Sequence, residues 1–300
     1  MSPVPQKGTN SQQAFAATIA GGLEILFFHP VDTSAKRLMS YQGKIATGGL
    51  SDTLSNVNQI VFKKKADASF VEKLKFLYPG SGYAVGYKVL QRVYKFAGQP
   101  IVRDYMNKNY SEGFKRWFGT KAKLMTESCS GCLIGIGEVI LLPLDRLKVL
   151  SQTNPEALGG RTALQVLRAE GIASGYAGAG ATVMRNAPGS FSLFGGTAFT
   201  KEVIFGLKDY RDATFLQNSV ASLVGSVLSI TVTNPMDVVK TRIQNKNFGE
   251  KTTGLRIVGE ILKHEGPTAF AKGLTPKVVA SAPKLVFAYT MTEYVAKLIR

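Results

Sequence analysis

The segments HPVDTSAKR (residues 29–37), LPLDRLKVL (142–150) and NPMDVVKTR (234–242) repeat the pattern Pro-x-Asp three times in a chain of 300 residues. The prolines are Pro30, Pro143 and Pro235, so the period is about a hundred residues. Each proline follows an apolar stretch of more than two helical turns: GGLEILFF, GIGEVILL and GSVLSITVT. A repeat of this length predicts one helical unit that is used three times.

A second landmark follows each Pro-x-Asp segment, in the form of a glycine that opens another apolar stretch. These glycines are Gly80, Gly178 and Gly273, and a glutamate stands eight residues before each of them, at Glu72, Glu170 and Glu265. Two landmarks in the same register argue against a chance repeat. Each unit therefore contains an apolar helix that ends near Pro-x-Asp, a polar connection and a returning apolar helix.

The landmarks predict six helical spans, at about residues 12–40, 80–107, 122–151, 178–206, 213–243 and 273–298. At about 1.5 Å per residue, each span is long enough to cross a hydrocarbon core of about 30 Å. The three units are residues 12–110, 119–209 and 213–300, and we expect the prolines to kink the odd-numbered spans. A buried helical bundle in a soluble protein is the alternative, since every span carries Gly, Ser or a charge.

Charge and composition limit the function classes. The formal net charge of +17 predicts attraction to nucleic acid, anionic lipid or a phosphorylated small molecule. The two cysteines, Cys129 and Cys132, exclude a disulfide-stapled secreted fold and make a metal site improbable. The common nucleotide-hydrolysing and metalloprotease motifs are absent, so we expect no enzyme and no cofactor. The start, MSPVPQKGTNSQQ, is neither a secretory signal nor an Arg-rich presequence, so we expect any targeting signal to be internal.

Both landmarks resemble the signature of the mitochondrial carrier family, which is P-x-[DE]-x-x-[KR] followed by [DE]-G-x-x-x-x-[aromatic]-[KR]-G. The resemblance covers the chain after residue 12. It implies an all-α membrane protein with six transmembrane helices in three pseudo-threefold repeats and short matrix helices. It also implies the mitochondrial inner membrane, both termini toward the intermembrane space, and exchange by alternating access around a central site.

In this family the acidic residues after the prolines form salt bridges with basic residues three positions on, which closes the matrix side. The resemblance assigns Asp32, Asp145, Asp237, Lys148 and Lys240 to this matrix gate. The first unit departs from the pattern because Ala35 stands where its basic residue belongs. One bridge is therefore missing or made differently, and we expect a weaker gate. The family's cytoplasmic pattern [FY]-[DE]-x-x-[KR] is absent, so the closing of the outer gate is not predicted.

The even-numbered spans carry cations that are costly in a membrane unless they face water and serve function. In the second span Lys88, Arg92 and Lys95 share one helical face, with Gln91 beside them. The sixth span places Lys277, Ser281 and Lys284 at the same spacing, and the fourth contributes Arg185 with Asn186. We expect Gly189 and Gly196, on the face of Arg185, to leave room beside it. For Lys95 and Lys277 the alternative is that they reach for lipid headgroups.

These cations predict an anionic substrate. The runs GYKVLQRVYKFAGQP, RNAPGSFSLFGG and PKLVF resemble fungal carriers of guanine nucleotides, which implies exchange of GTP for GDP. Guanine needs an acceptor for its N1 and N2 hydrogens and a donor to O6; Glu24 and Glu138 are candidate acceptors, and Asn186 or Gln91 candidate donors. The alternative is that one or both glutamates pair with the site cations or carry a proton. The predicted substrate site is thus Lys88, Gln91, Arg92, Arg185, Asn186, Lys284, Glu24 and Glu138.

Other partners and functions stay open at this point. An anionic inner-membrane lipid such as cardiolipin is a predicted partner, because Lys63, Lys64 and Lys65 lie in the first connection. One alternative is a carrier of another multivalent anion, such as a di- or tricarboxylate or another nucleotide. The other is a basic nucleic-acid-binding protein of the matrix.

Overall fold

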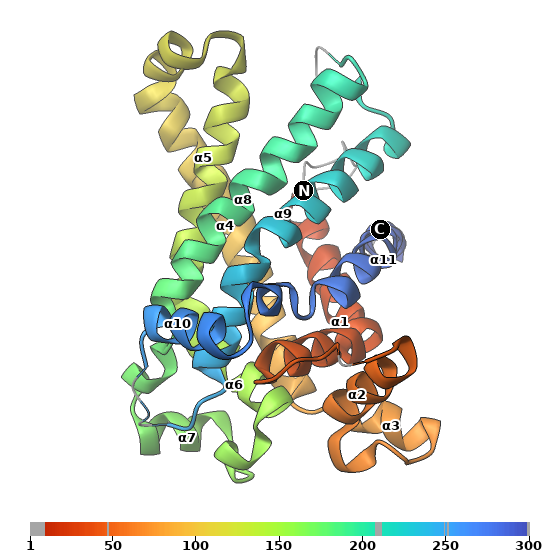
Figure 1. Ribbon diagram of the computed structural model, residues 1–300. Helices are drawn as coiled ribbons and strands as arrows, with labels where there is room; N and C mark the ends of the chain where they lie inside the picture. The colour runs from red at the N-terminus through yellow and green to blue at the C-terminus, as the bar shows by residue number, and fades with distance from the viewer. Residues whose placement is uncertain (1–9, 47, 208–211, 249, 251, 299–300) are drawn as a thin grey trace.

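The computed structural model describes residues 10–46, 48–207, 212–248, 250 and 252–298 (Figure 1). Six long helical segments dominate it, and its described residues contain no β-strand. The long segments are α1 (Asn10–Ser40), α4 (Ser81–Phe118), α5, η3 and α6 in sequence (Ala122–Gly137, Glu138–Leu141, Leu142–Thr153), α8 with η6 (Ala179–Phe199, Thr200–Ile204), α9 (Phe215–Gln244) and α11 (Leu274–Leu298). The predicted start of the chain (residues 1–9), the end of the second unit at residue 209 and the last two residues of the third unit lie outside the described residues.

Short helices connect the members of each pair. They are α2 (Leu50–Phe62), η1 (Lys63–Lys65) and α3 (Phe70–Phe76) in the first connection, η4 (Pro155–Leu158), α7 (Ala163–Glu170) and η5 (Ile172–Tyr176) in the second, and α10 (Gly254–His264) and η8 (Pro267–Ala271) in the third. They gather at one end of the bundle, which we call the short-helix end (Figure 1). At the other end the long helices splay apart, and η2 (Gly119–Lys121) joins α4 to α5.

The long helices form a closed ring. Each packs against the next in the order α1, α4, α5, α8, α9, α11, and α11 returns to α1. The ends of five segments fall within two residues of the predicted spans. Helix α4 is the exception, because it continues to Phe118 instead of ending near residue 107. The apolar pattern ends there but the helix does not, so the predicted boundary of the first unit at residue 110 falls inside α4.

The three landmark glycines have a common backbone conformation. Gly80, Gly178 and Gly273 have φ values of +66°, +86° and +73°, and each precedes the return helix of its unit. This left-handed region is costly for residues with a Cβ. At Gly273 a Cβ would also lie 2.8 Å from the carbonyl oxygen of Ala35. The repeated glycine therefore sets the angle at which the chain turns into the second long helix.

The long helices expose apolar side chains and bury polar ones. Large exposed apolar side chains occur on every long segment, among them Phe27, Ile101, Leu133, Met184, Val232 and Val279. The buried side chains include Arg37, Asp145, Gln152, Asp237 and Gln244. A soluble protein has the reverse distribution, and an apolar surface of this extent marks a contact with lipid or protein. The surface argues against the soluble-bundle alternative.

Only α9, among the described helices, is long and apolar enough to span a membrane by itself, and 11% of its most apolar window is buried. A core helix of a soluble protein would be mostly buried, so this window of α9 faces outward, whereas the end of the helix, with Asp237 and Gln244, is buried. The other long segments have the required length but carry charges, such as Lys88 and Arg92 in α4. The six predicted crossings are thus supported in length, and in apolarity for one helix.

Three buried arginines link the units at the short-helix end. The Nε atom of Arg37 donates to the carbonyl oxygen of Gln152 at 3.0 Å, which joins the first unit to the second. Nη2 of Arg146 donates to the carbonyl oxygen of Lys246 at 3.1 Å, which joins the second to the third. Arg242 then returns to the first unit.

Arg242 completes the circle through the end of α1. Its Nε and Nη2 atoms donate to the carbonyl oxygens of Met39 and Tyr41 at 3.2 and 2.8 Å. Arg242 and Lys272 both pair with Glu265. Burial alone would raise the pKa of Glu265, but hydrogen bonds from the two cations outweigh it and hold this pKa below its usual range. We call the three arginines the arginine cycle.

Candidate functional site

The three landmark prolines occupy different helical contexts. Pro30 and Pro235 lie inside the continuous helices α1 and α9. Pro143 lies at the start of α6, where the helix has passed from α5 through the 3₁₀ turn η3. A proline inside a helix removes one backbone donor, so α1 and α9 are weakened at Pro30 and Pro235, whereas Pro143 lies in the first turn of α6, where that donor is not needed. The three aspartates of the predicted gate lie two residues after these prolines, at Asp32, Asp145 and Asp237.

One gate bridge is formed by two residues of the Pro-x-Asp segments. Nζ of Lys240 lies 2.7 Å from Oδ2 of Asp145, and both side chains are less than a tenth exposed. Nε2 of Gln244 donates to the same oxygen at 3.3 Å. This bridge joins the second unit to the third, between two residues that were predicted to belong to the gate.

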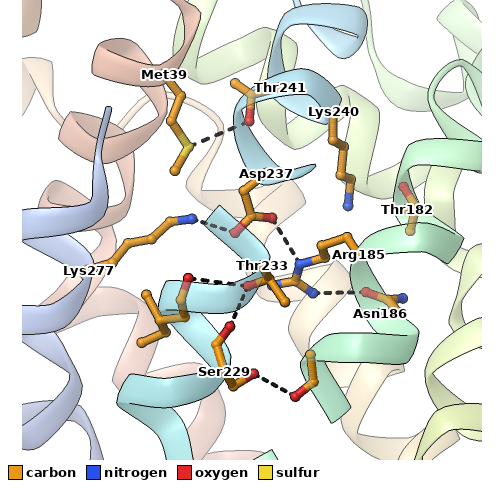
Figure 2. Close-up of polar contacts among 12 residues, drawn as sticks. Met39, Thr182, Arg185, Asn186, Ser229, Thr233, Asp237, Lys240, Thr241 and Lys277 are labelled. Carbon is orange, nitrogen blue, oxygen red and sulfur yellow. Dashed lines mark hydrogen bonds and ion pairs between the residues drawn. The ribbon is translucent and has the colours of Figure 1, made fainter. Parts of the chain in front are cut away.

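Asp237 is paired with residues from outside the Pro-x-Asp segments (Figure 2). Nε of Arg185, on α8, lies 2.9 Å from its Oδ1 atom, and Nζ of Lys277, on α11, lies 2.6 Å from its Oδ2 atom. Nη1 of Arg185 also donates to Oδ1 of Asn186 at 2.9 Å. The amide of Asn186 in turn donates to the carbonyl oxygen of Gly135 at 2.6 Å. Asn186 therefore fixes the position of the Arg185 side chain and is itself buried.

Asp32 pairs with Lys284, whose Nζ atom lies 2.5 Å from Oδ1. Lys148, the other predicted gate cation, has its Nζ atom 5.6 Å from the centre of the Tyr87 ring. Among the described residues no carboxylate lies within ion-pair distance of Lys148. Asp32 and Asp237 are thus paired with cations that the sequence analysis placed in the substrate site or on the same helices as that site.

Two glutamates of the odd-numbered segments hold the cations of α4. Glu24 lies 2.8 Å from Nη2 of Arg92 and 3.3 Å from Nζ of Lys88. The three residues form one cluster between α1 and α4, and Glu24 pairs with two cations there, which was the alternative to its contact with a base.

Glu138 collects a second cluster. Its Oε2 atom lies 2.9 Å from Nζ of Lys95, and its Oε1 atom accepts from the hydroxyl of Tyr87 at 2.7 Å and from the amide of Gln91. Lys95 is paired toward the interior here, as is Lys277, although headgroup contact was an alternative for both. Glu138 itself is buried.

The structure adds contacts that sequence reasoning missed. Tyr87 was not singled out, although it lies one residue before Lys88 and contacts both Glu138 and Lys148. Lys277 was not assigned to the gate, and its position seven residues before Lys284 was the available signal. The described residues contain no group of His, Cys, Asp and Glu side chains suited to a metal ion.

One prediction about α8 is wrong. Gly189 and Gly196 do not leave room beside Arg185, because they lie against α9. A Cβ on Gly189 would meet Cγ2 of Thr233 at 2.6 Å, and one on Gly196 would meet Cα of Gly225 at 3.0 Å. These glycines allow the backbones of α8 and α9 to approach closely, so the space beside the glycines is filled by α9.

Comparisons with known proteins point in one direction. A family model described as "Mitochondrial carrier protein" matches residues 120–208 and 211–300. The chain is 49% identical over 289 residues to mitochondrial GTP/GDP carrier protein 1 of Saccharomyces cerevisiae, covering 96% of this chain and 94% of the relative. It is 49% identical over 296 residues to an uncharacterized mitochondrial carrier of Schizosaccharomyces pombe, covering 98% and 96%. Mitochondrial glutamate carrier 2 of Mus musculus is 28% identical over 300 residues, covering 88% and 87%. With its repeated landmarks, helical architecture and these relatives, the chain belongs to the mitochondrial carrier family, whose members are all-helical membrane transporters.

Proposed function

We propose that this protein is an inner-membrane antiporter that exchanges guanine nucleotides, GTP for GDP. The observation that carries the proposal is the near full-length identity of 49% with a relative named as a GTP/GDP carrier. The interior cations provide the matching chemistry, because α4, α8 and α11 each direct Lys or Arg toward the odd-numbered helices. A nucleotide polyphosphate can contact several of them at once.

The six long segments would cross the membrane, with the short-helix end in the matrix and both chain termini toward the intermembrane space. In that orientation the three connections with their short helices lie in the matrix. Lys63, Lys64 and Lys65 are exposed there and would meet the headgroups of an anionic lipid such as cardiolipin.

Exchange would proceed by alternating access. The bridges at Asp32, Asp145 and Asp237 keep the matrix side closed until a nucleotide binds. Buried ion pairs lose much of their Coulomb attraction to desolvation, so they can be broken and remade in each cycle. Interactions of the nucleotide with the site cations offset the cost of breaking them, and an empty carrier therefore inverts slowly.

The nucleotide would bind with its phosphates on Arg185, Lys284, Lys88 and Arg92. The planar guanidinium of Arg185 matches phosphate oxygens in a bidentate geometry, and Lys284 acts as a point charge. The guanine base would lie near Glu138 and Gln91, which supply the acceptor and the donor that distinguish guanine from adenine. Glu24 would then serve to hold Lys88 and Arg92, and Asn186 to hold Arg185.

Uptake of labelled GTP into liposomes tests the proposal. The purified protein is reconstituted, and the liposomes are preloaded with GDP, GTP, ADP, citrate or nothing. We expect uptake only with a guanine nucleotide inside. Arg185→Ala should lower the rate roughly a hundredfold, since a charged hydrogen-bonding group is lost from the site. Arg256→Ala, which removes an exposed arginine of α10, is the matched control and should leave the rate unchanged.

Other outcomes would change the assignment. Uptake driven equally by citrate would replace the nucleotide by another multivalent anion and keep the fold. Equal uptake into empty liposomes would contradict exchange.

A further inference from the structure

The third gate bridge has no base of its own in this chain. In the second and third units the residue three positions after the aspartate is Lys148 or Lys240, and in the first unit it is Ala35. Ala35 is 1% exposed, so its position is filled by packing and holds no charge. By the threefold register, Asp237 should have been left without a partner.

Asp237 nevertheless has two cations. Arg185 reaches it from α8 and Lys277 from α11, at 2.9 and 2.6 Å, and the carboxylate is only 6% exposed (Figure 2). The neighbouring base Lys36 acts on Asp237 through space but forms no ion pair with it, and its Nζ atom donates to Oγ1 of Thr241 at 3.0 Å. An unpaired carboxylate at this depth would be costly, so the two cations meet a physical requirement that Ala35 creates.

The same two cations are more exposed than the carboxylate between them, and the side chain of Lys277 is 18% exposed. Arg185 is 36% exposed, although its partner Asp237 is nearly covered. Its side chain is held in place by Asn186, so its guanidinium is presented in a fixed orientation. By contrast, Lys240, which bridges Asp145, is 8% exposed. One bridge is therefore closed by a buried base, and the other by cations that a phosphate can reach.

We infer that Arg185 and Lys277 form the third bridge of the matrix gate in place of the base missing at Ala35, and that substrate phosphate and Asp237 compete for these two cations. The inference rests on the proposed function, because it takes the substrate to be a polyphosphate. Binding of the phosphates removes the partners of Asp237, so occupation of the site opens this bridge directly. Lys277 is thereby a residue of both the gate and the substrate site.

A comparison of Asp237→Asn with Asp145→Asn tests the competition. Both variants remove a gate carboxylate that is less than a tenth exposed, but only the first releases cations of the substrate site. We expect the half-saturating GTP concentration for exchange to fall about tenfold in Asp237→Asn, the size of one charged hydrogen bond. Asp145→Asn weakens the gate without releasing a cation of the substrate site, so its half-saturating concentration should fall by a clearly smaller factor, about twofold. Equal shifts in the two variants, or no shift in Asp237→Asn, would overturn the inference.

A second measurement needs no substrate. Thermal unfolding of the empty carrier is compared for Asp237→Asn, Lys277→Met and the double variant, beside the matched cycle of Asp145→Asn and Lys240→Met. We expect non-additive changes in both cycles, since the partners are in direct contact. Additive changes for Asp237 and Lys277 would show that the bridge does not exist in the protein and would sink the inference.

The two measurements separate this inference from the proposed function. If the Asp237 cycle is non-additive but wild-type liposomes take up no GTP, the bridge stands and the guanine substrate is wrong. Inorganic tripolyphosphate, which lacks a base, then serves as the probe. It should raise the unfolding temperature of Asp237→Asn more than that of Asp145→Asn, and the opposite order would refute the competition.

Discussion

Carboxylates inside the bundle form ion pairs with the interior cations. The pairs are Glu24 with Lys88 and Arg92, Glu138 with Lys95, Asp32 with Lys284, Asp145 with Lys240, and Asp237 with Arg185 and Lys277. A cluster of unpaired cations would repel itself and be costly to desolvate. The carboxylates therefore neutralise the interior cations, which stabilises the bundle.

Glu138→Gln should relax the choice between guanine and adenine. The carboxylate can accept two hydrogens from guanine, whereas an amide can accept only through its oxygen and would tolerate adenine. We expect the ratio of GTP to ATP uptake to fall roughly tenfold or more, within the range of one bidentate base contact. Competition of the two nucleotides for labelled GTP measures the ratio.

The matched variant is Glu24→Gln, which changes the glutamate that holds Lys88 and Arg92, the two cations of α4 that we propose to contact phosphate. It should lower the uptake of both nucleotides by a similar factor. A changed ratio in Glu24→Gln and none in Glu138→Gln would move the base to the other cluster.

At this scale the sequence predicted which residues lie in the interior but not all of their partners. Spacing of four and seven residues placed Lys88, Arg92 and Lys95 on one face, and the structure pairs all three with glutamates of other helices. The pairing of Asp237 with Lys277 could not be predicted. It depends on the lateral distance between α9 and α11, and helical periodicity carries no information about that distance.

Among the glycine contacts between long helices, those of α8 with α9 bring the two backbones closest together. A Cβ on Gly225 would lie against the carbonyl oxygen of Leu193 and the hydroxyl of Thr197, and Gly196 lies opposite. Small residues at such a contact allow backbones to pack closely in a membrane. The sequence showed these glycines, but not which face of α8 meets α9, so their role was misjudged.

Gly225→Ala should destabilise the carrier by roughly 2 kcal/mol, because an added methyl group must push the two backbones apart. Gly195→Ala is the control, since a Cβ at Gly195 has no neighbour within 4 Å. That substitution should be neutral or slightly stabilising in a helix. Thermal unfolding in detergent measures both. Equal stability of the two variants would show that the α8–α9 contact is looser than described.

Boundaries of the long helices were predictable where a landmark marks them. Gly80, Gly178 and Gly273 begin the return helices because their conformation excludes other residues. The end of α4 has no landmark, and its last eleven residues mix charged, polar and aromatic side chains, so the continuous apolar pattern stops before the helix does. The apolar pattern indicates how much of a helix can lie in the membrane, but it does not indicate how long the helix is.

For the whole molecule, the arginine cycle ties the three units together at the short-helix end. The first and third units use the residue seven positions after the proline, Arg37 and Arg242. By register the second unit should use Leu150, but Arg146 makes the contact from four positions earlier. A repeat pattern therefore predicts the three units, but it does not predict which residue completes their circle.

Arg146→Met should destabilise the carrier by on the order of 2–3 kcal/mol, because buried carbonyl oxygens lose a charged donor. For a chain of this size the unfolding temperature should fall by about 5 °C or more. Arg256→Met, which removes an arginine paired only with a neighbouring glutamate at the surface, should change it by a degree or less. Similar shifts for both variants would mean that the cycle adds nothing to stability.

Because α11 packs against α1, the ring of long helices is closed and has no first or last helix. The junction between the first and the last long helix is therefore of the same kind as the junction between any other two neighbours in the ring. A polypeptide that started at the second unit, with the old ends joined, would describe the same ring. The contacts between neighbouring helices are therefore independent of the unit at which the chain begins, and a carrier permuted in this way should keep the same ring.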